Sequence, residues 1–396
     1  MLLSERETLE RVLQSVEPLG VENVSIWDSR NRVLARDVIA TVALPRFDNS
    51  TMDGYAVRAE DAVQGARLVV RGEQAAGLDV GLSVGQGHAI RIFTGAPIPR
   101  QADAVVMQED ADLRDGVIFI RDGVTRGENI RVRGGDLCEG QVVASAGSVL
   151  TGPKLAAIAS QGLGELPVFE VPRVAILATG SELRSQGETI NAGQIYETNR
   201  IMLADLVAGS GCQGRIFNIV PDTEDAHLES FEQARASDVI VVAGGVSVGE
   251  KDLVKPTLLE LGAKLDLWRV AVKPGKPFMF GRLGRTLVFG LPGNPVSAFV
   301  TFLLFARPGL WKLGGRSSLD LPRARARLAE TLANRGERPH YLRGVYAEGF
   351  FKAVGRQESH ALFALSQANA LCRLEPNQVI AADSLVDVIP FFDAAC

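Results

Sequence analysis

The chain has few cysteines and histidines, and they do not form the patterns that bind metals or build disulfides. Its four cysteines are scattered, with no CxxC pair and no zinc-like spacing to the four histidines. This usage is typical of reduced thiols, so we expect a cytoplasmic protein. The histidines form no triad, and we expect them to be mainly structural. The residues are Cys138, Cys212, Cys372, Cys396, His88, His227, His340 and His360.

Long apolar runs and an excess of one charge are also missing. The most apolar expected helix runs from Val296 to Ala306 and is followed by Arg307 and Pro308, short of the roughly 20 residues that span a bilayer. The opening MLLSERETLERVL brings in charge too early for a signal peptide. Lys and Arg number 42 against 47 Asp and Glu, a net charge of -5. We therefore expect a soluble protein that binds neither membranes nor nucleic acid.

The opening residues instead predict an amphipathic helix. Ser4 and Glu7 have the spacing of a capping box, and Leu9, Val12, Leu13 and Val16 form its apolar face. A second helix is expected from Thr151, in TGPKLAAIASQG, and we expect the two helices to pack together.

The stretch between these helices predicts a small all-β domain. Short runs such as ARLVVRG, HAIRIFTG and GVIFI are separated by turn residues. We expect this β domain, residues 46–137, to be inserted in a discontinuous N-terminal domain of residues 1–45 and 138–170.

Residues 171–317 alternate between strand and helix patterns. RVAILAT, GRIFNIV, SDVIVVA and TLVFGL are continuous apolar runs, typical of strands buried on both faces. Helical stretches lie among them, which predicts a doubly wound, largely parallel sheet. Residues 318–396 lose the helical pattern, and RARARLAETL, HYLRGVY and ADSLVDVIPF predict a C-terminal β domain. The fold class is therefore multidomain α/β.

Three of these strands run into turns that are almost without side chains: AILATGSEL, VVAGGVSVGEKD and VFGLPGNPVSA. In open α/β sheets, ligands bind beyond the carboxyl ends of the strands, and glycine lets an anion approach backbone N–H groups. Asn294 is a good N-cap and Pro295 a good first helical residue, which favours phosphate at that helix start. One such turn would more simply be a tight connection; three at one edge favour a ligand crevice.

Charged residues of both signs accompany these turns. In KPGKP, prolines and a glycine fix the backbone between Lys273 and Lys276, which suits an oxyanion, although a solvated loop explains the motif equally well. Carboxylates recur in turn-rich motifs, and Mg²⁺ bound beside phosphate requires such groups. They are Asp48, Asp53, Asp136, Glu182, Asp222 and Asp252. No GxSxG, Walker A or HExxH motif is present.

Together, the motifs resemble one family. FDNSTMDGYAV, RIFTGAPIP, ENIRVRGGD, LATGSEL, AGGVSVGEKD, KPGKP and GLPGNPVSA follow the order of molybdopterin molybdenumtransferase, the family that includes the E domain of gephyrin. The resemblance covers nearly the whole chain and is weakest after residue 320. It implies a transferase of molybdenum cofactor biosynthesis that inserts molybdate into adenylylated molybdopterin, with Mg²⁺, and releases AMP. It also implies a homodimer with clefts between subunits, and suggests molybdopterin adenylyltransferase or apoenzymes as partners.

The resemblance also assigns roles to residues by motif match. Catalytic roles fall to Asp53, Thr94, Glu182, Asp252, Lys273 and Lys276. Contacts with the pterin substrate fall to Arg131, Asp136, Gly244, Gly245, Ser247, Arg269, Pro292, Gly293, Asn294 and Ser297. Asp222 and Asp252 would hold Mg²⁺, and Lys276, Arg343 and Ser359 would hold molybdate. These residue types suit molybdate binding and AMP release, since a dianion needs fixed cations and phosphoanhydride cleavage needs charge neutralisation.

Two departures from the family pattern stand beside these sites: Arg269 where lysine is usual, and Glu358 where glycine is common.

Two other functions are weighed against molybdenum insertion. A non-catalytic scaffold that binds a protein partner, as gephyrin does, conflicts with the intact Asp53, Glu182 and KPGKP lysines. Adenylylation of molybdopterin would leave residues 1–170 and 318–396 without a task.

Overall fold

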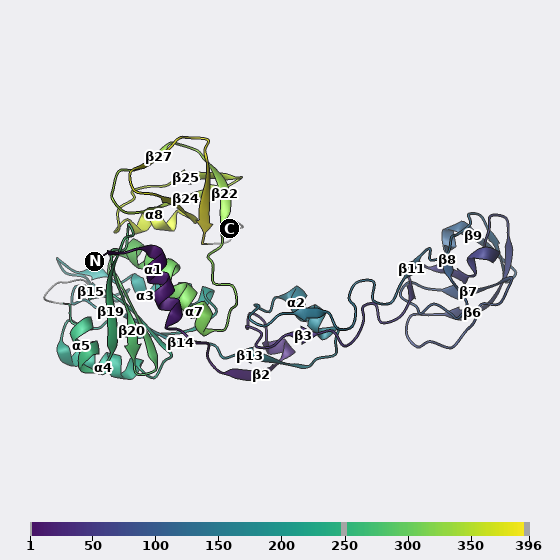
Figure 1. Cartoon of the computed structure of the whole chain (residues 1–396), viewed down its shortest axis with the longest axis horizontal. Helices are drawn as coiled ribbons and strands as arrows, with labels where there is room; N and C mark the ends of the chain where they lie inside the picture. Colours follow the sequence, from purple (N-terminus) through teal and green to yellow (C-terminus); the bar gives the residue numbers. More distant parts are fainter. Residues whose placement is uncertain (1, 247–251, 392–396) are drawn as a thin grey trace. The chain divides into compact units, whose positions relative to one another are not determined.

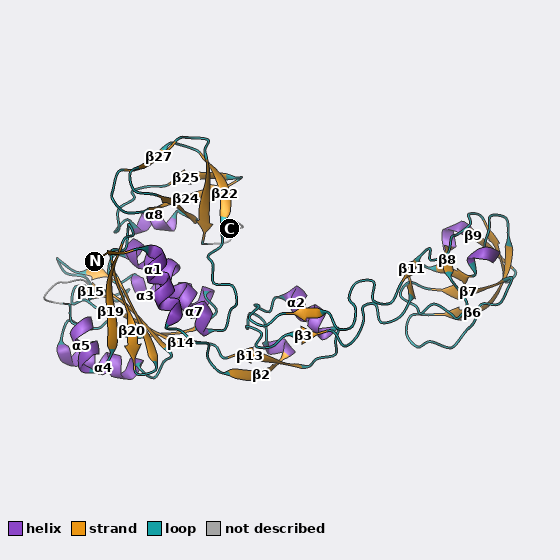
Figure 2. Cartoon of the chain, in the orientation of Figure 1, coloured by secondary structure: helices purple, strands orange, loops and turns teal. Residues whose placement is uncertain are grey.

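The computed structural model describes residues 2–246 and 252–391 of the chain, apart from the side chains of residues 267 and 268. The chain divides into two compact units. Figures 1 and 2 show its helices and strands. The larger unit comprises Met1–Arg36, Ala146–Thr151 and Glu165–Cys396. The smaller unit comprises Asp37–Ser145 and Gly152–Gly164. The finer division into four domains stays a prediction.

The centre of the larger unit is a seven-stranded sheet in the order β1-β19-β20-β21-β18-β14-β17. Four neighbouring strands, β21, β18, β14 and β17, are parallel, and β20 is antiparallel to both of its neighbours. The strands are β1 (Leu2–Leu3), β14 (Arg173–Ala178), β17 (Gln213–Ile216), β18 (Val239–Ala243), β19 (Lys264–Val270), β20 (Pro277–Leu283) and β21 (Thr286–Leu291). The predicted strands and their largely parallel arrangement are confirmed.

Helices cover both faces of this sheet. Val174 and Ile176 point into one apolar core and Ala175 and Leu177 into another, because successive side chains of a strand alternate between faces. The first core includes residues of α1 (Glu5–Gln14), α3 (Asn199–Gly209), α6 (Pro295–Thr301) and α7 (Arg307–Leu313). The second includes residues of α4 (Glu224–Ala234) and α5 (Val254–Glu260). The sheet is therefore doubly wound, as predicted.

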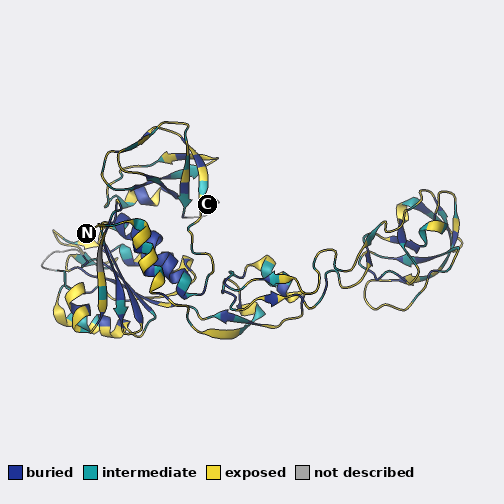
Figure 3. Cartoon of the chain, in the orientation of Figure 1, coloured by how far each residue is buried: buried dark blue, intermediate teal, exposed yellow. Residues whose placement is uncertain are grey.

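Helix α1 begins as its sequence predicts but packs elsewhere. The hydroxyl of Ser4 accepts the N–H of Glu7 (3.2 Å), and the carboxylate of Glu7 accepts the N–H of Ser4 (2.8 Å), which completes the capping box. Val12 and Val16 are fully buried in the first core of the sheet, beside α7. The expected packing against the helix after Thr151 is therefore wrong: the apolar stripe of α1 is used by the α/β core, and Figure 3 shows its other side exposed.

The apolar helix after Asn294 is longer than expected. It continues from Pro295 to Leu313 instead of ending at Ala306. A π-helical turn at Phe302–Ala306 precedes Pro308, and the N–H of Arg307 donates to the carbonyl of Phe302. This wider turn accommodates a proline that would break a regular helix. By length and composition the helix could cross a membrane, but 89% of it is buried inside the unit, as in a core helix.

The rest of the larger unit is mainly β-structure. Five strands close a barrel in the C-terminal region: β22 (Ala324–Leu328), β25 (Phe350–Ala353), β24 (His340–Ala347), β26 (Ala370–Leu374) and β28 (Leu385–Pro390). Smaller elements accompany them: β23 (Leu332–Asn334), β27 (Gln378–Ile380) and α8 (Leu362–Ser366), and elsewhere β2 (Val21–Ser25), β13 (Glu165–Phe169), β15 (Leu183–Arg184), β16 (Ile195–Tyr196) and a 3₁₀ turn (Ile26–Asp28). The predicted C-terminal β region is confirmed.

The smaller unit is built on a six-stranded sheet, β8-β5-β7-β6-β10-β9. These strands are β5 (Gly54–Val57), β6 (Arg67–Gln74), β7 (His88–Ile92), β8 (Ala104–Met107), β9 (Ala111–Arg114) and β10 (Val117–Ile120). The unit also contains β3 (Val38–Ile39), β4 (Asn49–Ser50), β11 (Ile130–Arg131), β12 (Val142–Ala144), α2 (Gly152–Ala159) and two 3₁₀ turns (Ala59–Asp61, Gln108–Asp110). The predicted β character of this segment is confirmed.

Candidate active site

The three glycine-bearing turns lie side by side at one edge of the large sheet. In the register of the parallel strands, Ala243 pairs with both Ala178 and Leu291, the last residues of the two neighbouring strands. The ladder continues one step further, since the N–H of Thr179 donates to Ala243 (3.1 Å) and the N–H of Gly244 to Leu291 (3.1 Å). The turns therefore leave the sheet together, as the sequence predicts.

A cleft of about 510 Å³ lies between these turns. The size suits a small-molecule substrate. The predicted site residues that line it are Glu182, Asp222, Gly244, Gly245, Asp252, Pro292, Gly293 and Asn294. Ser247 lies outside the described residues. The cleft thus brings together the backbone turns and the carboxylates that were inferred separately from the sequence.

Two glycines keep the floor of the cleft bare. Gly244 has a φ of +94°, and a Cβ there would lie 2.8 Å from the carbonyl oxygen of Thr179. A Cβ on Gly180 would lie 2.6 Å from the carboxylate of Glu182, so this carboxylate folds back over its own turn. A larger residue at either position would force a shift, whereas glycine leaves the backbone open to a ligand.

Of the carboxylates that line the cleft, Asp222 is held in place by a neighbouring turn. The N–H of Ser181 donates to the carboxylate of Asp222 (2.9 Å), and the N–H of Asp222 donates to the hydroxyl of Ser181 (3.0 Å). Asp252 lines the same cleft. Within residues 2–246 and 252–391, no three acidic, histidine or cysteine side chains form a metal cluster. Mg²⁺ needs only one or two carboxylates when substrate phosphates complete its shell, so Asp222 and Asp252 fit it.

Asn199 also lines the cleft and was not predicted. Its side-chain N–H donates to the carbonyl of Gly293 (2.8 Å), which fixes the amide. Its Oδ1 is buried and accepts no hydrogen bond from the part of the chain that the structure describes. An unpaired buried acceptor costs free energy unless a ligand donates to it. The sequence did contain a signal for this residue: Asn199 is the first residue of helix α3, and polar residues at helix starts near a ligand cleft are candidates for binding.

The KPGKP turn lies next to the cleft. Its last residue, Pro277, lines the cleft, and the four residues before it do not. The turn is seated on α6, since a Cβ on Gly275 would lie 2.6 Å from Thr301. Its Pro274 and Gly275 are buried, whereas the side chains of Lys273 and Lys276 are exposed. The turn thus combines a fixed backbone with two exposed lysine side chains. That the motif holds both charges in place for an oxyanion stays a prediction.

Arg343 of the barrel strand β24 is fully buried yet only partly satisfied. Its Nη2 donates to the carbonyls of Arg356 (2.6 Å) and Glu358 (3.3 Å). Its Nε and Nη1 are buried without a hydrogen-bond partner among the residues described. Burial lowers the pKa of Arg343 to about 10, although the negative charge of Glu358 opposes this. The departure at Glu358 therefore places a carboxylate where it stabilises this guanidinium.

His340, at the start of the same strand, is also buried. Burial, together with the positive charges of Lys273, Arg343 and Arg338, lowers its pKa to about 4. Its Nε2 is buried without a partner in the described part of the chain. A neutral histidine and three cations thus converge where the barrel meets the KPGKP turn, an environment that favours an anion.

Ser359, which was predicted to bind molybdate, connects this region with the cleft through Asn294. The side-chain amide of Asn294 donates to the hydroxyl of Ser359 (3.1 Å), and the N–H of Val296 donates to the carbonyl of Ser359 (3.2 Å). Asn294 is the N-cap of α6, but its side chain makes no capping bond. Ser297 is buried in the first turns of that helix. Arg269 is exposed and pairs in the sheet with Pro277 of the cleft.

The smaller unit holds the other predicted residues. The backbone N–H and the hydroxyl of Thr94 both donate to the same oxygen of Asp53 (2.8 Å each). These bonds, and the charge of Arg91, lower the pKa of Asp53. Arg131 pairs with Asn49 between β11 and β4. Asp136 lies in an exposed loop. The structure thus joins Asp53 to Thr94; the roles of all four predicted residues stay predictions.

Three family models match the chain: the MoeA N-terminal region (domain I and II) at residues 3–162, a probable molybdopterin binding domain at 175–312, and the MoeA C-terminal region (domain IV) at 325–391. A molybdopterin molybdenumtransferase of Haemophilus influenzae is 37% identical over 383 residues, 94% of this chain and 95% of the relative.

The chain belongs to the molybdopterin molybdenumtransferase (MoeA) family.

Two further MoeA proteins are similar to this chain, one in sequence and one in structure. A molybdopterin molybdenumtransferase of Nostoc sp. is 36% identical over 94% of this chain and 89% of its own. The structure of a molybdopterin biosynthesis MoeA protein from Pyrococcus horikoshii OT3 covers 99% of this chain and 100% of its own, with 28% identity and a TM-score of 0.85. The family expected from the motifs is confirmed, and with it the function of a transferase in molybdenum cofactor biosynthesis.

Proposed function

We propose that this MoeA enzyme inserts molybdate into adenylylated molybdopterin in the cleft beyond β14, β18 and β21, with release of AMP. The bare backbone of the three turns and the N-terminal end of α6 would bind the phosphate groups of the substrate. The unpaired Oδ1 of Asn199 would accept a hydrogen bond from an N–H of the ligand. These groups bind and orient the substrate beside the carboxylates.

Asp222 and Asp252 would hold Mg²⁺ against the substrate phosphates. The metal, when bound, would neutralise the charge that develops as the phosphoanhydride breaks. The protein's own contribution is positional: the two bonds between Ser181 and Asp222 keep one carboxylate at the rim of the cleft. Glu182, folded over Gly180, supplies a third carboxylate from the neighbouring turn.

Molybdate would bind next to the cleft, among Lys273, Lys276, Arg343 and Ser359. A tetrahedral dianion needs several fixed donors of positive charge. The unsatisfied Nε and Nη1 of buried Arg343 provide two such donors, and Ser359 is tied to Asn294 of the cleft. The roles of Asp53, Thr94, Arg131 and Asp136 rest on the family resemblance.

The observation that carries this proposal is the cleft itself, in which Glu182, Asp222 and Asp252 line the same space as Pro277 of the KPGKP motif. The test is incubation of the purified protein with adenylylated molybdopterin, molybdate and Mg²⁺, followed by assay of AMP and of active cofactor. AMP release that depends on both molybdate and Mg²⁺ is the expected result. Binding of the pterin without any AMP release would refute the proposed reaction.

We further propose that the enzyme acts as a cytoplasmic homodimer, with molybdopterin adenylyltransferase or apoenzymes as protein partners. Sedimentation at assay concentration should give twice the mass of the 42.4 kDa chain. A fully active monomer would contradict the dimer, and cell fractionation tests the location.

A further inference from the structure

The segment Leu2–Glu5 touches both chain segments that carry the cations of the proposed molybdate site. One segment is the loop that leads from β19 into KPGKP, and the other is the barrel strand β24. None of the four residues of Leu2–Glu5 was assigned to the site from the sequence. Their contacts link two parts of the unit that are far apart along the chain.

The first contact is made by strand β1. Leu2 and Leu3 pair in parallel with Arg269 and Val270 at the end of β19. One residue later, the N–H of Ala271 donates to the carbonyl of Leu3 (2.8 Å). The backbone is thus held up to two residues before Lys273, at the point where the sheet ends and the KPGKP turn begins.

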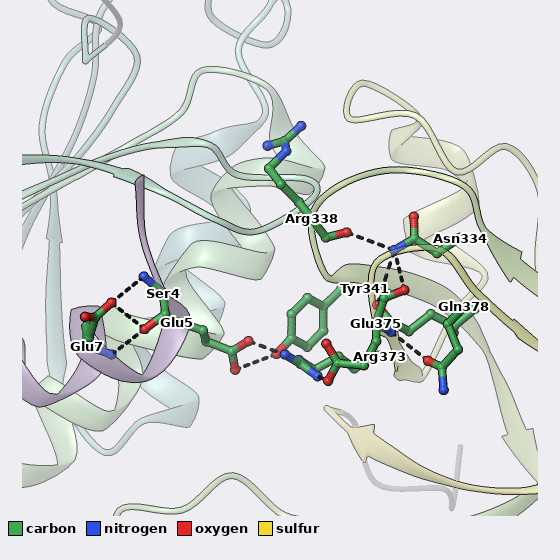
Figure 4. A network of polar contacts seen from close by, with 10 residues as sticks. Ser4, Glu5, Glu7, Asn334, Arg338, Tyr341, Arg373, Glu375 and Gln378 are labelled. Atoms are coloured by element: carbon green, nitrogen blue, oxygen red, sulfur yellow. Dashed lines mark hydrogen bonds and ion pairs between the residues drawn. The ribbon is translucent and has the colours of Figure 1, made fainter. Parts of the chain in front are cut away.

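The second contact is made by Glu5, the first residue of α1 (Figure 4). One carboxylate oxygen accepts the hydroxyl of Tyr341 (2.6 Å), and the other accepts Nε of Arg373 (3.1 Å). Arg373 also pairs with Glu375. Tyr341 is almost fully buried, and burial together with the charge of Glu5 raises its pKa, so that its hydroxyl remains a donor.

The two contacts meet at Lys273. The N–H of Lys273 donates to the carbonyl of Pro339 (2.8 Å), and the N–H of Tyr341 donates to the carbonyl of Lys273 (2.8 Å). Arg338 adds a bond from its Nη1 to the carbonyl of Val272 (2.7 Å). Tyr341 therefore fixes Lys273 through its backbone while its side chain is held by Glu5. Arg343 follows two residues later on the same strand.

We propose that Glu5 is a positioning residue for oxyanion binding: through Tyr341 it sets the distance between Lys273 on the KPGKP turn and Arg343 on the barrel. The proposal rests on the proposed function, because it concerns the same molybdate site. Glu5 itself touches no substrate. Its effect follows from geometry, since cations on two separate segments bind one small dianion well only if both are held in place.

The kinetic test uses Glu5→Gln and Tyr341→Phe. The first leaves the tyrosine only a weaker, neutral acceptor and removes the charge that holds Arg373. The second removes only the hydroxyl. Glu10→Gln is the matched control, because Glu10 lies on the same helix and pairs at 3.6 Å with an exposed Arg6. In both test variants the molybdate concentration for half-maximal AMP release should rise by about 2- to 30-fold, with little change in kcat. In the control neither quantity should change.

A lower melting temperature with unchanged half-saturation would overturn the proposal, because Glu5 would then contribute to stability alone. The double variant gives a second criterion: its effect should fall well short of the product of the two single effects, since both changes break one network. Independent, multiplicative effects would also overturn it.

Hydrogen exchange separates this proposal from the proposed function. In Glu5→Gln, but not in Glu10→Gln, the amides of Lys273 and Tyr341 should exchange faster, by a similar factor of about 2 to 30. Faster exchange in a protein that releases no AMP would leave the positioning role standing and refute the reaction. Unchanged exchange in an active protein would refute the positioning role alone.

Discussion

Replacing Lys276 by alanine should weaken molybdate binding while the fold stays intact. The side chain of Lys276 is exposed, so its removal creates no cavity. The turn is held by its backbone, because the carbonyl of Lys276 accepts the N–H of Val270 (2.8 Å) and the neighbouring Gly275 is seated against Thr301. Alanine keeps these contacts, and only the ammonium group is lost.

The size of the effect follows from the exposure of that ammonium. A hydrogen bond to a charged group contributes about 1.5–3 kcal/mol, and solvent screening around an exposed lysine places this one at about 1–2 kcal/mol. This corresponds to a rise of about 5- to 30-fold in the molybdate concentration needed for half-maximal insertion. Because mass action offsets weak binding, excess molybdate should restore most of the rate.

The assay is AMP release at increasing molybdate, with binding of adenylylated molybdopterin measured in parallel. Lys264→Ala is the control, since Lys264 is an exposed lysine that begins β19, at the opposite end of the sheet from the cleft. It should behave as the unaltered protein. If Lys276→Ala instead loses pterin binding and ignores added molybdate, Lys276 contacts the pterin phosphate and the assignment is refuted.

Three further outcomes are expected. Asp252→Ala should retain its circular dichroism spectrum but lose most AMP release; an unchanged rate with unchanged Mg²⁺ dependence would remove Asp252 from the site. Ser4→Ala should lower the free energy of unfolding in urea by about 1 kcal/mol, because the capping box loses its hydroxyl; an effect near zero would contradict the cap. The native pKa of His340 lies near 4 against an ordinary value of 6.5. Between these values the unfolded chain binds a proton that the native chain does not, so stability should fall as pH drops from 6.5 to about 4, and less so in His340→Gln.

Local signals in the sequence were sufficient for much of the fold. The capping box of Ser4 and Glu7 gave the start of α1, and the buried runs before Thr179, Gly244 and Pro292 gave three adjacent parallel strands. The convergence of Glu182, Asp222 and Asp252 followed from the rule that ligands bind at the carboxyl ends of such strands. These features depend on spacing within a few residues or on a general property of the fold class.

What the sequence could not predict depends on contacts between distant segments. The partner of α1 is α7, about 300 residues away, and an apolar stripe does not specify which surface will cover it. The helix was expected to end before Pro308 because a π turn has no sequence signature. The unpaired atoms of Asn199 and Arg343 become visible only when all neighbouring donors and acceptors are placed.

The packing of α1 against α7 has a consequence for synthesis on the ribosome. Val12 meets the surface at Gly309, where an added Cβ would lie 3.2 Å from it. At about 5–20 residues per second, roughly 15–60 s pass between the translation of these two positions. During that time the stripe of α1 lacks the cover that α7 provides, while the smaller unit, Asp37–Ser145 with Gly152–Gly164, is completed. The nascent chain therefore leaves part of this apolar stripe exposed to solvent until α7 has been synthesised.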